Sequence, residues 1–196
     1  MSLRGEGALA IWHDLEPEAE PDFIEWHNRE HMPERLGVPG FLRGRRYRAV
    51  AGAPRWFVLY ETKDLAVLTS AAYLARLNDP TPWTRRLVPS FRNTARAICT
   101  VAATTGVGAG GHMLTVRLDP RPGQQDDLRR WLTAEFLPAA DAAPGIVGAH
   151  LGVADQAAST VETEEKRRRA EPDRVPGSVL LVEGSSRDSL APIERR

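Results

Sequence analysis

An internal repeat is the feature that most constrains how this chain folds. When the sequence is shifted by 105 positions, a pattern W-x3-E-x2-P-x5-P-G falls on itself without a gap. A sequence that matches itself at a fixed spacing predicts two copies of one structural unit. We therefore expect a first unit over residues 1–105, which carries the candidate site, and a second, degenerate unit over residues 106–196. The matched pairs include Leu9 and Leu114, Asp22 and Asp127, Trp26 and Trp131, Glu30 and Glu135, Pro33 and Pro138, and Pro39 and Pro144.

The spacing of apolar residues predicts the element order β-α-β-β-α-β for the first unit. This order is the ferredoxin-like arrangement, an α+β fold in which two helices cover one face of an antiparallel sheet. We expect strands near residues 8–14, 41–50, 56–62 and 97–103, and helices near residues 20–36 and 65–77.

The second copy departs from the first in two places. About 17 residues are inserted before its third strand, and residues 162–174 of this insert carry five acidic and five basic side chains. Such mixed charge predicts a solvated helix or a flexible loop with local ion pairs. The sequence stops at Arg196, where the second helix of this copy would start. We therefore expect the second unit to be incomplete, either because the copy is degenerate or because the chain is a fragment.

Composition narrows the range of partners. The 26 basic and 26 acidic residues give a net charge of zero, which argues against a nucleic-acid or an acidic-membrane partner. The single cysteine, Cys99, excludes an intramolecular disulfide and a cysteine-based zinc site. Neither a signal peptide nor an apolar run of about 18 residues is present, so we expect a cytoplasmic protein.

Two histidines on the first helix are the strongest candidates for chemistry. His27 and His31 lie four residues apart and share one face of the helix with Phe23. The equivalent positions of the second copy are all apolar, which indicates that this face packs against the sheet or lines a pocket. An imidazole titrates near neutral pH and suits proton transfer. The equivalent residues are Leu128, Leu132 and Phe136.

The segment from His27 to His31 also spells H-x-x-E-H, a pattern in which two histidines bind zinc and the glutamate is a general base. A third ligand would have to come from elsewhere, and a five-residue pattern with two free positions has low specificity. Glu30 is matched by Glu135 in a copy with no histidine beside it, which favours a structural contact for Glu30.

A longer stretch carries a family resemblance. The sequence WHNREHMPERLGVPGF, which follows a strand and is followed by Arg45-Arg46-Tyr47, resembles the dimeric α+β barrel superfamily. The likeness is to its EthD-like branch, through the His-x-Pro of His31-Met32-Pro33. The resemblance implies ferredoxin-like units that pair sheet to sheet, with a pocket near the first helix. Relatives include small lyases, isomerases and cofactor-free oxygenases acting on aromatic or polyketide compounds, and some bind haem.

The tandem copy suggests that the two units pair within one chain, so we expect a homodimer or an intrachain pseudo-dimer.

Further residues are candidates for the pocket wall. Among them, His13 is matched by Leu118 in the second copy and can face inward. An arginine on the second strand would suit an anionic substrate, and an exposed sheet edge is the alternative. The candidate ligand-binding residues are His13, Trp12, Arg45, Tyr47, Tyr60 and Trp83.

These observations favour a small-molecule enzyme without a nucleotide or metal cofactor. His31 would be its general acid/base and His27 the orienting or second proton-transfer group. The substrate would be a small, mainly apolar carbonyl or aromatic compound. Two alternatives remain open: a non-catalytic binding or dimerisation module of the same fold, and haem binding by an inward histidine.

Overall fold

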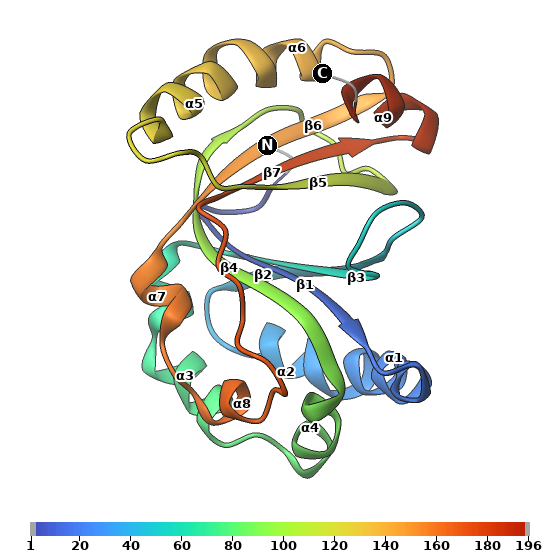
Figure 1. Ribbon diagram of the computed structural model, residues 1–196, viewed down its shortest axis with the longest axis vertical. Coiled ribbons are helices and arrows are strands. Elements are labelled where there is room, and N and C mark those ends of the chain that lie inside the picture. Colours follow the sequence, from blue (N-terminus) through green and yellow to red (C-terminus); the bar gives the residue numbers. More distant parts are fainter. Residues whose placement is uncertain (1–2, 195–196) are drawn as a thin grey trace.

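The computed structural model describes residues 3–194, and their strands form one antiparallel sheet of order β2-β3-β1-β4-β6-β7-β5. The sheet is accompanied by helices, which confirms the expected α+β fold class (Figure 1). The strands are β1 (Gly7–Leu15), β2 (Phe41–Arg48), β3 (Trp56–Thr62), β4 (Phe91–Thr104), β5 (His112–Leu118), β6 (Ile146–Ala154) and β7 (Ser178–Gly184).

The sheet doubles back on itself, so that β1–β4 face β5–β7 and the helices lie on the two outer sides (Figure 1). Strand β4 makes this possible because it is 14 residues long. Its first part pairs with β1, and its last part pairs with β6 from Cys99 opposite Ala154 to Thr104 opposite His150. Two sheet layers of one chain thus meet face to face.

The helical segments largely follow the expected positions. The run Glu20–Trp26 (α1), a π-helical turn over His27–His31, and Met32–Leu36 (α2) is continuous. In the first half α3 (Ala71–Asn78) and α4 (Pro82–Leu87) follow. The remaining helices are α5 (Gln125–Trp131), a π-helical turn (Leu132–Phe136), α6 (Leu137–Asp141), α7 (Gln156–Thr160), α8 (Glu164–Arg167) and α9 (Arg187–Glu194).

A π-helical turn occurs at the same place in both halves, and a proline explains it. Pro33 has no backbone N–H and its ring crowds the carbonyl one turn earlier, so the regular ladder is interrupted. The helix widens instead, and the backbone N–H of Met32 donates to the carbonyl of His27, five residues back. Pro138 has the same effect, with Leu137 donating to Leu132. The site histidines therefore lie on a widened turn, a geometry frequent at functional sites.

Three expectations about local structure need correction. Residues 65–69 form a 3₁₀ turn, so α3 starts at Ala71, and β4 starts at Phe91 rather than near residue 97. Trp83 lies in α4, because Thr81 caps this helix by accepting a hydrogen bond from the N–H of Thr84 and Pro82 occupies its first turn. The second helix of the second half, expected to be missing, is present as the short α9.

The charged insert makes contacts with the first half that were not expected. It crosses to the first half, where Arg35 Nη2 donates to Glu165 Oε2 at 2.5 Å, both side chains being buried. Arg174 pairs with β4 through two main-chain hydrogen bonds: its carbonyl accepts from the N–H of Arg96, and its N–H donates to the carbonyl of Thr94. Local ion pairs such as Arg167 with Glu164 do form. The insert therefore contains a short helix with local ion pairs, one of the two expected forms, and it also covers part of the first half.

A charge network lies between the two sheet layers, among small apolar side chains. Arg45 of β2 contacts Glu61 of β3 at 3.1 Å and Glu183 of β7 at 2.7 Å, and both carboxylates are buried. Arg43 adds a pair to Glu61, and His150 lies 3.3 Å from Glu183. Arg45 thus joins the two halves through their equivalent glutamates.

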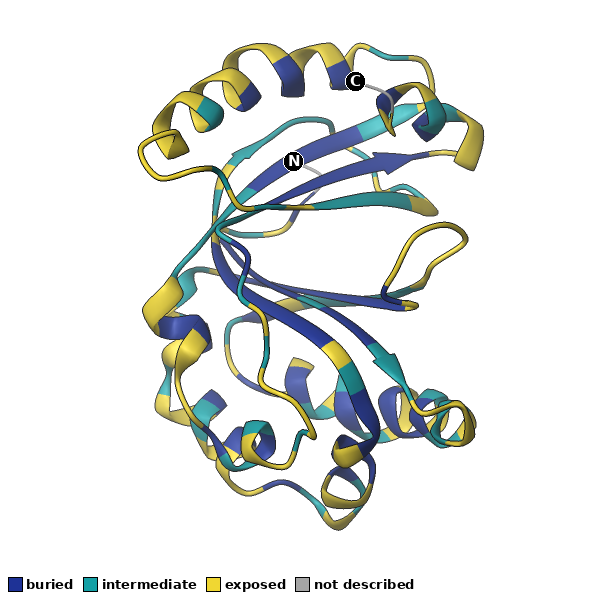
Figure 2. Ribbon diagram, in the orientation of Figure 1, coloured by how far each residue is buried: buried dark blue, intermediate teal, exposed yellow. Residues whose placement is uncertain are grey.

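The paired tryptophans differ in burial, although packing in both copies was expected. Trp26 is buried beneath α4 and donates to Thr84 Oγ1, whereas Trp131 is 49% exposed on α5. The outer side of α5 is exposed along its length (Figure 2). We therefore expect Trp131→Gln to change the free energy of unfolding by less than about 1 kcal/mol. Urea unfolding measures it, with Trp26→Gln as the matched variant. Equal losses at both positions would contradict the difference in packing.

Candidate functional site

A small cavity of about 30 Å³ lies between the helical run 20–36 and the helix-covered face of the sheet layer formed by β1–β4. His27 and His31 reach it from the π-helical turn, His13 from β1 and Tyr60 from β3. Strand alternation explains the convergence, since His13 and Ile11 share the helix-facing side of β1. The lining residues are Ile11, His13, Phe23, Trp26, His27, His31, Val58, Tyr60, Val88, Phe91, Glu165 and Arg169.

His31 is the histidine of this cavity with an unpartnered buried nitrogen, and Arg169, which also lines the cavity, has an unpartnered Nε. The ring of His31 lies on Trp26, with centroids 4.1 Å apart and planes inclined by 31°. Its Nδ1 is buried and has no hydrogen-bond partner among residues 3–194. Leaving a buried polar atom unpaired costs about 1–3 kcal/mol, so such an atom calls for an explanation. A ligand atom in the cavity would supply the missing partner.

His27 is held by a tyrosine and not by the other site histidine. Its Nε2 lies 3.3 Å from the hydroxyl of Tyr60. The rings of His27 and His31 are 5.8 Å apart between centroids. His27 therefore contacts the Tyr60 hydroxyl at the cavity, and its expected role as the orienting or second proton-transfer group stays a prediction.

His13 closes the inner end of the cavity. Its Nδ1 is 3.3 Å from the carbonyl of Asp14, and its ring packs on Phe91 with centroids 4.4 Å apart. Phe23 contacts the same ring edge-on. The environment of the three imidazoles is therefore mainly aromatic.

Burial keeps the histidines uncharged. It lowers the pKa of His27 from 6.5 to about 3, with the charge of Arg46 as the next cause. Burial likewise lowers the pKa of His13 to about 3. The pKa of His31 is well below its usual value, first through burial and then through Arg35. All three are neutral at physiological pH, so His31 is in the form that accepts a proton, and its expected role as the general acid/base stays a prediction.

Positive side chains surround the apolar cavity without entering hydrogen bonds to the histidines. The guanidinium of Arg46 lies over the rings of Phe23 and Trp56, 5.5 Å from each centroid. Arg169, from the insert, lines the cavity with Glu165 and pairs with Asp173. These cations favour a negative charge that forms in the cavity.

The charged insert of residues 162–174 supplies part of the wall of the histidine cavity. The sequence analysis did not predict this role. Glu165 and Arg169 come from the second half, yet they close the cavity of the first half. The only signal was the unexplained run of charges in residues 162–174. Its contacts with Arg35 are long-range and could not be read from local spacing.

The remaining candidates lie elsewhere. Trp12, Arg45 and Tyr47 face the space between the sheet layers, because adjacent strand residues point to opposite faces. Trp83 donates its Nε1 to Asp22 on the outer side of α1.

Glu30, the glutamate of the H-x-x-E-H pattern, accepts a hydrogen bond from Thr81 at 2.5 Å, which is the structural contact that its repeat favoured. In the described part of the chain, no three histidine, cysteine, aspartate or glutamate side chains are grouped to hold a metal ion.

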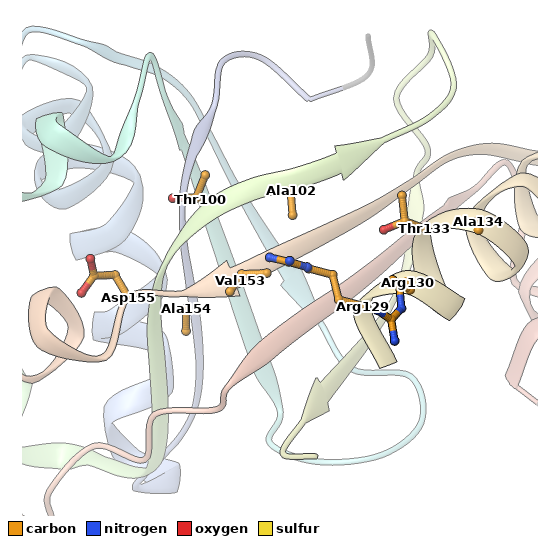
Figure 3. Close-up of a pocket in the computed structure, with 9 residues that line it drawn as sticks. All are labelled: Thr100, Ala102, Arg129, Arg130, Thr133, Ala134, Val153, Ala154 and Asp155. Carbon is orange, nitrogen blue, oxygen red and sulfur yellow. The ribbon is translucent and has the colours of Figure 1, made fainter. Parts of the chain in front are cut away.

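A larger depression of about 840 Å³ lies between α5 and the neighbouring ends of β4 and β6 (Figure 3). Its arginines, Arg129 and Arg130, are exposed and each pairs with an aspartate of its own helix. No buried titratable side chain lines it. The depression therefore lacks the groups that make the histidine cavity chemically distinctive.

No protein-family model and no curated protein matches the sequence. Solved structures do match in fold. An anthrone oxidase-like protein is 13% identical, with a TM-score of 0.62 over 97% of this chain and 77% of that one. A provisionally assigned monooxygenase of Lactobacillus acidophilus is 8% identical, with a TM-score of 0.58 over 97% and 82%.

A third structure, a provisionally assigned monooxygenase of Fusobacterium nucleatum, is 13% identical, with a TM-score of 0.55 over 99% and 82% of the two chains. These similarities show that nearly the whole chain shares its α+β fold with these structures. Fold alone does not assign chemistry. Among residues 3–194, no helix has the length and apolarity needed to cross a bilayer.

Proposed function

We propose that the chain is a small-molecule enzyme in which neutral His31 removes a proton from a flat, mainly aromatic substrate. The observation that carries the proposal is the buried, unpartnered Nδ1 of His31 at the cavity. In the step, the substrate C–H bond breaks, Nδ1 gains the proton, and the electron pair moves to a neighbouring carbonyl oxygen as an enolate. This step is common to the lyase, isomerase and cofactor-free oxygenase activities that the EthD-like motif implies.

The low basicity of His31 restricts the substrate. A base with a depressed pKa removes only a proton that is already activated, for instance one flanked by a carbonyl and aromatic rings. The enolate would be stabilised by Arg46 and Arg169, and the hydroxyl of Tyr60 is placed to donate a hydrogen bond to it. The aromatic walls of Phe23, Trp26 and Phe91 suit a planar ring.

Substrate entry requires the cavity to enlarge, because 30 Å³ corresponds to about one water molecule. The insert is the element that would move, since it contributes Glu165 and Arg169 to the wall and is held by the Arg35–Glu165 pair. Segments that close over active sites commonly act in this way.

The first test follows exchange of the C10 protons of anthrone into D₂O under argon, a probe chosen from the anthrone oxidase-like neighbour. We expect the protein to accelerate exchange and His31→Phe to lose at least about 100-fold, the usual contribution of a positioned base. Stability should stay within about 1–2 kcal/mol, because Phe136 occupies the equivalent position and no partner of Nδ1 is stranded.

His27→Leu is the comparison variant, chosen because Leu132 occupies the equivalent position. This substitution leaves the Tyr60 hydroxyl without its hydrogen-bond partner, so it should lower the free energy of unfolding by about 1–3 kcal/mol and also lower the exchange rate. Adding Tyr60→Phe in the same chain should restore part of the stability. Unchanged exchange in a folded His31→Phe protein would refute the proposal.

The small cavity also favours a second candidate, a non-catalytic binding module. Anthrone binding by calorimetry without proton exchange would support it. Haem binding is a third possibility, since a neutral imidazole can ligate iron, but the cavity is far smaller than a macrocycle. A Soret band after haemin addition that is lost in His31→Phe would be required to retain this alternative.

A further inference from the structure

A second cavity lies on the other face of the sheet layer formed by β1–β4, away from the histidines. It is a cleft of about 410 Å³ between the β2–β3 hairpin, the first residues of β5, and α9. This volume falls within the range of small-molecule sites. The lining residues that the argument uses are Trp12, Tyr47, Phe57, Met113 and Arg187.

The cleft exists because of the sheet order. On one side β4 fills the position between the two layers by pairing with both β1 and β6. On the other side β2 and β5 are the edge strands of the described sheet, and no strand of residues 3–194 lies between them. Main-chain donors and acceptors of both edges therefore remain free to contact a ligand.

The inner wall of the cleft is aromatic. Trp12 and Phe57 are buried and their rings are 4.9 Å apart, and Tyr47 is stacked on Phe57 with centroids 6.1 Å apart. The Nε1 of Trp12 donates to Thr115 Oγ1 across the layers, which fixes the indole. Because Trp12 and Phe57 are almost fully buried, the half-buried ring of Tyr47 is the accessible part of this wall.

The rim of the cleft is mainly positive. Arg48 and Arg187 line it, whereas Glu194 is its only acidic lining residue among those described. Arg117 lies 5.5 Å from the indole centroid of Trp12 and donates to the carbonyl of Ala53, so a third cation stands at the same end. Guanidinium groups recognise carboxylates through paired hydrogen bonds.

From this combination we infer that the inter-sheet cleft is a binding site for a small planar aromatic carboxylate. The ring lies on the Tyr47 side of the aromatic wall, and the carboxylate pairs with Arg117 and Arg187. The site is separate from the histidine cavity and does not depend on the proposed proton abstraction, because the two lie on opposite faces of one layer.

The test is calorimetric titration with 2-naphthoate, and with neutral 2-naphthamide as the matched ligand. We expect 2-naphthoate to bind with one site per chain and 2-naphthamide to bind about tenfold more weakly, as loss of a charged hydrogen bond implies. Arg117→Gln with Arg187→Gln should weaken 2-naphthoate to the level of the amide. Met113→Trp should abolish binding by filling the cleft.

Two controls locate the site. Arg129→Gln removes an exposed arginine of the other depression and His31→Phe alters the histidine cavity, and neither should change 2-naphthoate affinity. Equal binding of the acid and the amide, unchanged binding in folded Met113→Trp, or loss of binding in His31→Phe would each overturn the inference.

Discussion

Arg45→Met is expected to lower the free energy of unfolding by about 3 kcal/mol or more, because it leaves Glu61 and Glu183 buried without their shared cation. Glu183 depends most on this pair. Hydrogen bonds from His150 and Arg45 hold its pKa down to about 2 against the effect of burial. Without Arg45 the pKa of the buried Glu183 carboxyl should rise, so the stability that the parent protein loses through this group between pH 4.5 and pH 2 should be smaller in the variant. Urea and acid titrations monitored by circular dichroism measure both effects.

Arg46→Met is the matched control. Arg46 is the next residue of β2, faces the other side of the sheet, and has no carboxylate partner within residues 3–194. We expect it to cost about 1 kcal/mol, the scale of its contact with aromatic rings. The double variant Arg45→Met/Glu183→Leu should recover part of the loss, since an apolar pair can replace a buried ion pair. Similar losses for Arg45→Met and Arg46→Met would show that the network does not join the halves.

Lowering the pH from 7 to 5 is expected to destabilise the protein by about 2 kcal/mol for each buried site histidine. An unfolded histidine binds a proton as the pH falls below 6.5, whereas folded His13 and His27 do so only near pH 3. Between these values the unfolded state binds more protons, so acid favours unfolding. Below pH 4.5 the carboxyl of Glu183 adds a loss of the same sign.

The assignment of this pH dependence can be checked with single variants. His27→Leu should reduce the loss between pH 7 and pH 5 by about 2 kcal/mol, even though its stability at pH 7 is lower. His112 is exposed on β5, outside the cavity, and His112→Gln should show the same loss as the parent protein. A parent protein whose stability is flat between pH 7 and pH 5 would contradict the buried, neutral state of the histidines.

Local signals in the sequence were sufficient for the elements that carry the histidines. The expected helix over residues 20–36 matches the observed run at both ends, because apolar spacing, Pro33 and the Pro39-Gly40 turn are all local features. The inward direction of His27 and His31 followed from Leu132 and Phe136, which are buried at the equivalent positions. His13 and Tyr60 joined them because alternation along a strand fixes which face each side chain takes.

Strand alternation also explains why other candidate residues do not line the histidine cavity. Trp12 and Tyr47 were grouped with the histidines as aromatic residues, but they point to the opposite face of the layer and line the inter-sheet cleft. Arg45 was weighed as an anion-binding residue or an exposed edge residue. It is instead paired with two buried carboxylates, one of which is 138 residues away in sequence.

The sequence by itself therefore determined the order of strands and helices in the first half, the fold class and the helix face that bears His27 and His31, since these depend on spacing within one element. Tertiary structure alone decided that the insert covers the first half, that Glu165 meets Arg35 across 130 residues, and that the histidines are neutral. The physical reason is that burial and long-range ion pairing depend on which segments meet in space. A protonation state follows from that environment and not from the residue type.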